Sequence, residues 1–162
     1  MKIEWIKLVS AIIICNLAGI IGSVFTFQNI QDWYNPILVK PSFAPPGSVI
    51  GIIWTVLYFL MGVSLYLLWT DYEEKKDNRY KTVFMLFAAQ LIMNAAWSFL
   101  FFEMQSPFSG LIGIVILWIL IMATIIKVNE VNRNAALLLV PYILWVTFAG
   151  FLNFTIWQLN PY

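Results

Sequence analysis

The chain has 162 residues, of which 62% are hydrophobic and 10% are charged, and its net charge is +1. A soluble domain has about 45–50% apolar and about 25% charged residues, so a water-soluble fold could not bury this much apolar surface. The near-neutral charge also gives no basis for a nucleic-acid partner.

Five runs without Lys, Arg, Asp or Glu follow one another along the chain. They cover residues 8–27, 48–70, 82–102, 108–126 and 134–159. A helix of about 20 residues crosses about 30 Å of hydrocarbon, whereas a membrane barrel needs strands of about 10 residues that alternate in polarity. The sequence therefore predicts an all-α membrane protein, a bundle of five transmembrane helices that forms one domain over residues 1–162.

Basic residues gather on one side of this predicted bundle. Eight of the nine Lys and Arg residues fall at the N-terminus, in the second loop or in the fourth loop, and Lys40 alone falls on the other side. By the positive-inside rule, the N-terminus is predicted to be cytoplasmic and the C-terminus to lie outside. This pattern is typical of a multi-pass protein of the cell membrane.

The first predicted helix, residues 8–27, is longer than the apolar region of a signal peptide. No A-x-A cleavage site follows it, so we expect a retained helix rather than a cleaved signal. The helix contains Cys15, the single cysteine, which we expect to be a small buried apolar residue.

The predicted outer loop, residues 28–47, contains four prolines between positions 36 and 46. Proline fixes its own backbone angle and removes an amide donor, so this loop should be stiff and non-helical, with Gly47 opening the second helix. The loop also carries Trp33, Tyr34 and Phe43. We interpret it as a lid over the bundle, with a plain connector between two helices as the alternative.

Aromatic and amide side chains recur at helical spacing on three of the predicted helices. These stripes are Trp54, Tyr58 and Met61 on the second helix, Gln90, Asn94, Trp97 and Phe101 on the third, and Trp145, Ala149, Leu152 and Asn153 on the fifth, with Phe148 adjacent. An amide in hydrocarbon needs a partner, so these amides should point into the bundle. They are either links between helices or the orienting groups of an apolar pocket.

The sequence lacks the residues that several kinds of chemistry require. The chain has no histidine, no pair of acidic residues inside a span, and neither a P-loop nor a G-x-S-x-G motif. We therefore expect no metal site, no cofactor, no hydrolase activity and no pump based on buried carboxylates.

Three stretches of the chain resemble the TspO/MBR family, the tryptophan-rich sensory proteins and mitochondrial translocator proteins. They are WYNPILVKPSFAPPGSVIGIIWTVLY (33–58), QLIMNAAWSFLFF (90–102) and PYILWVTFAGFLNFTIWQLN (141–160). The resemblance implies five tightly packed helices, a homodimer, and a pocket beneath the first loop. Members of the family bind porphyrins and haem, flat drugs such as isoquinoline carboxamides and benzodiazepines, and, in animals, cholesterol.

Carried over position by position, the resemblance implies ten ligand-binding residues. They are Tyr34, Pro45, Pro46, Trp54, Tyr58, Asn94, Trp97, Trp145, Phe148 and Ala149. Trp54 and Trp145 also stand at the positions implicated in light-dependent porphyrin breakdown by some bacterial relatives. The cholesterol consensus of animal members is not matched, because residues 152–162 contain no basic side chain.

The leading hypothesis is a membrane receptor for a protoporphyrin IX-like molecule or another flat hydrophobic ligand. Metal-free porphyrin is favoured over haem because no histidine is available as an axial ligand. One alternative is a light- and oxygen-dependent porphyrin-degrading enzyme with Trp54 and Trp145 as catalytic residues. A second is a transporter of tetrapyrroles or lipids, which the lack of internal repeats disfavours. A purely structural role in membrane assembly is the third.

Overall fold

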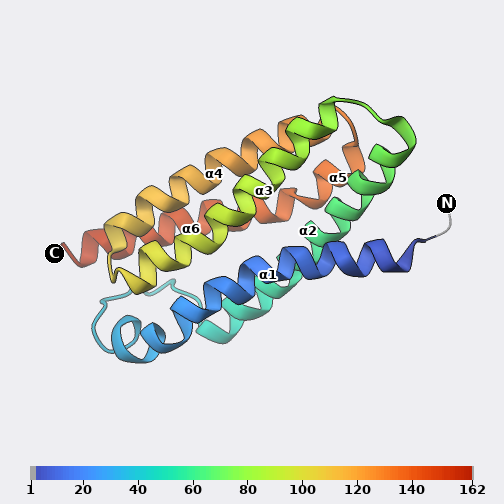
Figure 1. Ribbon diagram of the computed structural model, residues 1–162. Coiled ribbons are helices and arrows are strands. Elements are labelled where there is room, and N and C mark those ends of the chain that lie inside the picture. Colours follow the sequence, from blue (N-terminus) through green and yellow to red (C-terminus); the bar gives the residue numbers. More distant parts are fainter. Residues whose placement is uncertain (1–2, 162) are drawn as a thin grey trace.

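The computed structural model describes residues 3–161 and consists of long helices that lie roughly side by side (Figure 1). The elements are α1 (Trp5–Asn29) with a π-helical turn (Ile30–Tyr34), α2 (Gly47–Lys75), α3 (Arg79–Ser98) with a π-helical turn (Phe99–Glu103), α4 (Pro107–Asn129), α5 (Arg133–Leu138) and α6 (Val140–Leu159). They form five spans, because α5 and α6 together make the last one. The prediction of a five-helix membrane protein is confirmed.

The helices extend further than the apolar runs did. The second run was predicted to end at residue 70, but α2 continues to Lys75. The predicted loop boundary was wrong, since residues 28–34 are helical and only 35–46 form the loop. Polar side chains such as Gln28 and Asp32 end an apolar run without ending a helix, and the chain leaves helical structure only as it reaches Pro36.

Local capping fixes the starts of the later helices. The Ser106 hydroxyl accepts a hydrogen bond from the Ser109 amide at 3.1 Å, and Pro107 occupies the first turn of α4. Asn132 caps α5 in the same way. Pro141 has no amide hydrogen to donate, and the last span breaks at Leu139, immediately before α6 begins.

The helices pack in a ring with one loose side. α1 packs on α2 and α3, α4 packs on α3 and α6, and the short α5 packs on α2 and α4. The α1–α2 contact is very close, because a Cβ atom added at Gly62 would lie 2.6 Å from the Ile12 Cα atom. By contrast, α6 is not among the close neighbours of α2. The last span therefore leaves α2 beyond the break at Leu139.

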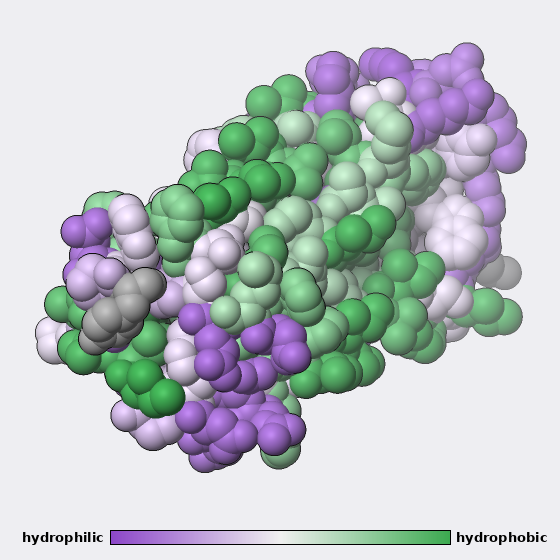
Figure 2. Space-filling view, turned by 60° about the vertical axis from the view of Figure 1, so that its left-hand side comes forward, coloured by the Kyte–Doolittle hydropathy of each residue, from purple (hydrophilic) through white to green (hydrophobic). Residues whose placement is uncertain are grey.

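The surface matches a protein that lies in lipid. Hydrophilic residues gather toward the two ends of the molecule, and hydrophobic residues cover the sides between them (Figure 2). Side chains such as Ile6, Val24 and Ile92 are at least 70% exposed on these sides. The two termini lie at opposite ends of the bundle (Figure 1). We call the end with residues 35–46 and the last turn of α6 the loop end.

Candidate functional site: an aromatic cavity under the loop

A cavity of about 650 Å³ lies at the loop end, between α1, α2, α3 and α6 and beneath residues 35–46. Its volume falls within the range of about 300–1,000 Å³ typical of small-molecule sites. Its walls are mostly aromatic and aliphatic, and a few hydroxyl and amide groups interrupt them.

All ten side chains that the family resemblance implies lie around this one cavity. The lining includes Tyr34, Pro45, Pro46, Trp54, Tyr58, Asn94, Trp97, Trp145, Phe148 and Ala149. They come from the loop and its preceding turn, from α2, from α3 and from α6. The structure therefore brings the predicted residues together, while their binding of a ligand stays a prediction.

Two of the polar side chains that line the cavity are Tyr58 of α2 and Asn94 of α3, and Tyr142 of α6 bonds to Asn94 from outside the lining. We call these three residues the polar floor. The Tyr58 hydroxyl donates to Asn94 Oδ1, and Asn94 Nδ2 donates to the Tyr142 hydroxyl at 2.8 Å. All three residues are buried, with 1–8% of their surface exposed. Because each partner satisfies the next, this chain of hydrogen bonds fixes three helices around the deep end of the cavity.

A second polar group at the wall serves mainly to join helices. The Trp97 indole donates to the Gly110 carbonyl at 3.0 Å, and Asn153 Nδ2 donates to the Pro107 carbonyl at 2.8 Å. These bonds tie α3 and α6 to the first turn of α4. Asn153 also lines the cavity, so it links two helices and stands at the cavity wall.

Gln90 lies on the same predicted stripe as Asn94 but is not part of the cavity lining. Its side chain is buried, and its amide nitrogen is 4.0 Å from the Met61 sulfur. Its Oε1 atom has no hydrogen-bond partner among residues 3–161. The helical spacing thus gave the correct face for Gln90, but the residue sits beyond the closed end of the cavity.

The loop that roofs the cavity is held at two points. Asn160, just after α6, accepts a hydrogen bond from the Val39 amide at 3.0 Å and donates to the Val39 carbonyl at 2.9 Å. Lys40 Nζ donates to the carbonyls of Tyr34 and Asn35 at 3.0 and 3.2 Å and lies 4.8 Å from the centre of the Tyr34 ring. Within the described residues, Lys40 is the one charged side chain that lines the cavity.

The three aromatic residues assigned to the lid have different positions. Tyr34 lines the cavity, as predicted. Trp33 is buried instead against Phe101, with ring centres 5.5 Å apart. Phe43 packs outside the cavity on α6, where it stacks on Phe151 at 5.4 Å.

Sequence reasoning missed the contribution of α1. The cavity lining includes five residues of this helix and the turn after it: Gly19, Gly22, Ser23, Thr26 and Ile30. Their spacing of three, one, three and four places them on one face, and most of them are small. Small residues give no chemical signal in a sequence, but a small face on an otherwise bulky helix is a sign that something packs or binds there.

The residues present define what the cavity could hold. Among residues 3–161, no group of three His, Cys, Asp or Glu side chains lies close enough to hold a metal ion. The walls offer aromatic faces from three helices, and the single cation lies at the loop. Such a site fits a flat apolar molecule with a polar or anionic edge at the loop end.

Comparison with known proteins gives a consistent result. The model of the TspO/MBR family matches residues 11–158. The chain is 46% identical to the tryptophan-rich protein TspO of Chlorobaculum tepidum over 149 residues, which cover 91% of this chain and 92% of that protein. It is 42% identical to the tryptophan-rich protein TspO of Archaeoglobus fulgidus, covering 96% and 97% of the two chains. It is also 32% identical to the translocator protein of Bos taurus, covering 96% and 91%.

Proposed function

The chain belongs to the TspO/MBR family of multi-pass membrane proteins, and we propose that it is a receptor that binds porphyrins and other flat hydrophobic molecules in the cavity under the loop. The observation that carries this proposal is the enclosed aromatic space of about 650 Å³ inside a bundle of membrane-spanning helices. Isoquinoline carboxamides and benzodiazepines are smaller aromatic molecules that would use the same apolar walls.

The aromatic walls supply most of the attraction. Trp54 and Trp145 lie on different helices, and both line the cavity. Trp54 also stacks on Tyr58, with ring centres 5.6 Å apart and an interplanar angle of 27°. Stacked or edge-on aromatic contacts each contribute about 0.5–1.5 kcal/mol beyond the burial of apolar area. A planar macrocycle between these rings would gain several such contacts at once.

The polar groups set the orientation of the ligand. The Lys40 ammonium group at the loop end suits the carboxylates of a dicarboxylic porphyrin. The floor groups at the opposite end already bond to one another, so the ligand would present its apolar edge there. The chain has no histidine to serve as an axial ligand, so metal-free protoporphyrin IX is the form that the residues fit.

Binding is tested by titrating the reconstituted protein with protoporphyrin IX and following the porphyrin absorption band. Replacing Trp54→Leu and Trp145→Leu together should remove about 1–3 kcal/mol of aromatic contact, which weakens binding about fivefold to about 150-fold. The matched control is Trp5→Leu with Trp157→Leu, which removes two indoles away from the cavity lining and should leave the affinity unchanged. Equal affinity for both double variants would contradict the proposed site.

Light- and oxygen-dependent breakdown of the bound porphyrin is a second candidate activity. Two oxidisable indoles, Trp54 and Trp145, lie at the cavity wall next to the space for the macrocycle. Illumination of the complex in air should then bleach the porphyrin band faster than illumination of free porphyrin in empty nanodiscs. Trp54→Phe should slow this decay while binding persists. Equal decay rates for free and bound porphyrin would leave binding alone.

The setting of the receptor is also proposed. Seven basic residues that the structure describes lie toward the end opposite the loop, whereas Lys40 lies at the loop. The positive-inside rule then places the loop and the cavity mouth outside the cytoplasm, in the cell membrane. We further expect a homodimer from the family resemblance, which the mass of the complex in nanodiscs would test.

A further inference from the structure

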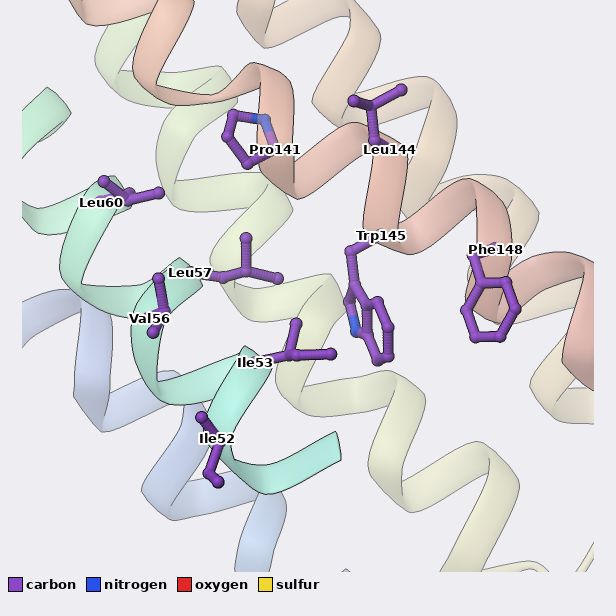
Figure 3. A pocket seen from close by; sticks show the side chains of 9 residues that line it. All are labelled: Ile52, Ile53, Val56, Leu57, Leu60, Pro141, Leu144, Trp145 and Phe148. Atoms are coloured by element: carbon purple, nitrogen blue, oxygen red, sulfur yellow. The ribbon is translucent and has the colours of Figure 1, made fainter. Parts of the chain in front are cut away.

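A second hollow lies on the lipid-facing side of the bundle, between α2 and α6. It has a volume of about 500 Å³. We call it the α2–α6 groove; its lining consists of Ile52, Ile53, Val56, Leu57 and Leu60 of α2 and Pro141, Leu144, Trp145 and Phe148 of α6 (Figure 3). Every one of these side chains is apolar apart from the Trp145 indole nitrogen, so the groove suits a hydrocarbon environment.

The groove exists because the last span is broken. The segment before the break, α5, packs on α2, but beyond Leu139 the chain turns onto α4, and α6 is not among the helices that pack closely on α2. Pro141 lies at this point and lines the groove itself. The side of the helix ring between α2 and α6 is therefore closed mainly by side chains.

Two side chains separate the groove from the cavity. Trp145 and Phe148 line both spaces. Their ring centres are 5.3 Å apart, and Figure 3 shows the Trp145 ring directed from α6 toward Ile53 of α2. The loop residue Phe43 packs edge-on against Phe148, with ring centres 6.4 Å apart. A partition one side chain thick thus lies between the lipid and the aromatic cavity.

Within the described part of the chain, the Trp145 ring is not held by a hydrogen bond, in contrast to the rings of Trp97 and Trp118. The Trp97 indole donates to the Gly110 carbonyl at 3.0 Å, and the Trp118 indole donates to the Thr147 hydroxyl at 2.8 Å. The Trp145 indole nitrogen is buried and has no acceptor among residues 3–161. Turning this ring aside would break no hydrogen bond, whereas turning either of the others would.

We propose that hydrophobic ligands enter the cavity from the bilayer through the α2–α6 groove, with Trp145 and Phe148 as the gate. This inference rests on the proposed function, because it concerns the path to the same cavity. A ligand that dissolves in lipid reaches the groove by diffusion in the membrane plane. The gate rings then swing apart and close behind it, so that they form part of the cavity wall in the bound state.

The test closes the groove without touching the cavity lining. Val56 of α2 and Leu144 of α6 both line the groove, are more than half exposed and do not line the cavity. The variant Val56→Cys with Leu144→Cys is joined by a short bismaleimide in detergent, and the product is verified by mass before transfer to lipid nanodiscs. The unreacted variant is the first control, and the wild type, whose Cys15 is buried, is the second.

The measured quantities are the association and dissociation rate constants of protoporphyrin IX, from stopped-flow quenching of tryptophan fluorescence. Closing an entry path raises one barrier for both directions, so both constants should fall by about tenfold or more, while Kd stays within about twofold. The bulky variant Val56→Phe with Leu144→Phe should act in the same direction without a cross-link. Adding the same bulk to a lipid-facing side of α4, with Ile116→Phe and Ile119→Phe, should leave both constants unchanged.

The competing path runs from water through the loop. It is tested by a disulfide between Val39→Cys and Asn160→Cys, two positions whose native contact already ties the loop to the end of α6. The proposal expects unchanged rates with the loop tied. Unchanged rates with the groove closed, or a slowing only when the loop is tied, would overturn it. A change in Kd, with only one of the two rate constants altered, would make the groove part of the binding site rather than a path, and would overturn it as well.

Failure of the proposed function gives a different result. If the unreacted variant and the wild type both leave the porphyrin unbound, the receptor assignment itself is wrong, and the path proposal falls with it. If both bind the porphyrin, and cross-linking leaves the rate constants of the variant unchanged, the receptor assignment stands and only the path is refuted.

Discussion

Replacement of Asn94 by leucine should destabilise the protein through a specific pair of lost hydrogen bonds. Asn94 accepts from the Tyr58 hydroxyl and donates to the Tyr142 hydroxyl at 2.8 Å, and all three residues are buried. Side-chain hydrogen bonds between membrane helices average about 0.6 kcal/mol and reach about 1.7 kcal/mol. Since leucine has a similar size, the loss of both bonds should lower the free energy of unfolding by about 1–3 kcal/mol.

A double-mutant cycle isolates one of these bonds. Tyr58→Phe and Asn94→Leu each leave a buried partner unpaired, but the double variant removes both members of the pair together. The double variant should therefore be about 0.6–1.7 kcal/mol more stable than the sum of the two single effects predicts. The free energy of unfolding is measured by titration with a denaturing detergent in mixed micelles.

The control uses a neighbour on the same helix face. Gln90 lies one turn from Asn94 and does not contact the Tyr58 hydroxyl, so Tyr58→Phe and Gln90→Leu should be additive to within about 0.5 kcal/mol. Additive effects for Tyr58→Phe with Asn94→Leu would refute the polar floor as described. The network would then contribute nothing to holding α2 and α3 together.

Three further changes test other contacts. Asn160→Ala removes the two hydrogen bonds that hold the loop backbone and should speed amide hydrogen exchange of residues 35–46, whereas replacement of the exposed Gln158 by alanine should not. Equal exchange rates in the two variants would show that Asn160 does not hold the loop. Gly62→Ala would place a methyl group 2.6 Å from the α1 backbone and should lower the free energy of unfolding by about 1–3 kcal/mol. Gly51→Ala, with open space around it, should be neutral or stabilising by up to about 1 kcal/mol, and a larger loss of stability in Gly51→Ala than in Gly62→Ala would contradict the packing. Gln90→Leu removes a buried amide whose oxygen is unpaired among residues 3–161 and should leave stability unchanged or raise it by about 1 kcal/mol; a loss comparable to that of Asn94→Leu would show that the amide has a partner.

The number and order of the spans follow from the sequence because lipid enforces a single solution. A backbone in hydrocarbon must satisfy its own hydrogen bonds, and unpaired charge is expensive there, so apolar runs and helices coincide. Beyond the membrane that constraint disappears. Helix α2 continues through Glu73 and Lys75, and α1 continues into the turn at Asp32, where charged and polar residues are solvated. Runs of apolar residues therefore locate spans well and helix ends poorly.

The cavity was predictable only in part, because helical spacing defines a face and not a depth. Asn94 and Gln90 share a face of α3, but only Asn94 reaches the cavity. Gly19 and Gly22 line the cavity through the absence of a side chain, which no chemical motif records. The α2–α6 groove depends on how far two helices diverge after Leu139; Pro141 marks the place of the break, but the direction of α6 follows from its packing on α4, which no local residue pattern records.

The distribution of polar groups explains how one site would accept many ligands. The floor hydroxyls and amide bond to one another, and the Trp97 indole bonds to α4, so a ligand finds these groups already occupied. Some sites contain buried polar groups that form hydrogen bonds only with a specific ligand. Such a site binds molecules without the matching group far more weakly, because its polar groups are then left unpaired. If the proposed function holds, that penalty is absent at the floor, and recognition would rest on aromatic area and on the cation at Lys40. Flat molecules should therefore bind according to their shape, and an acidic group directed at the loop should distinguish the tighter ligands among them.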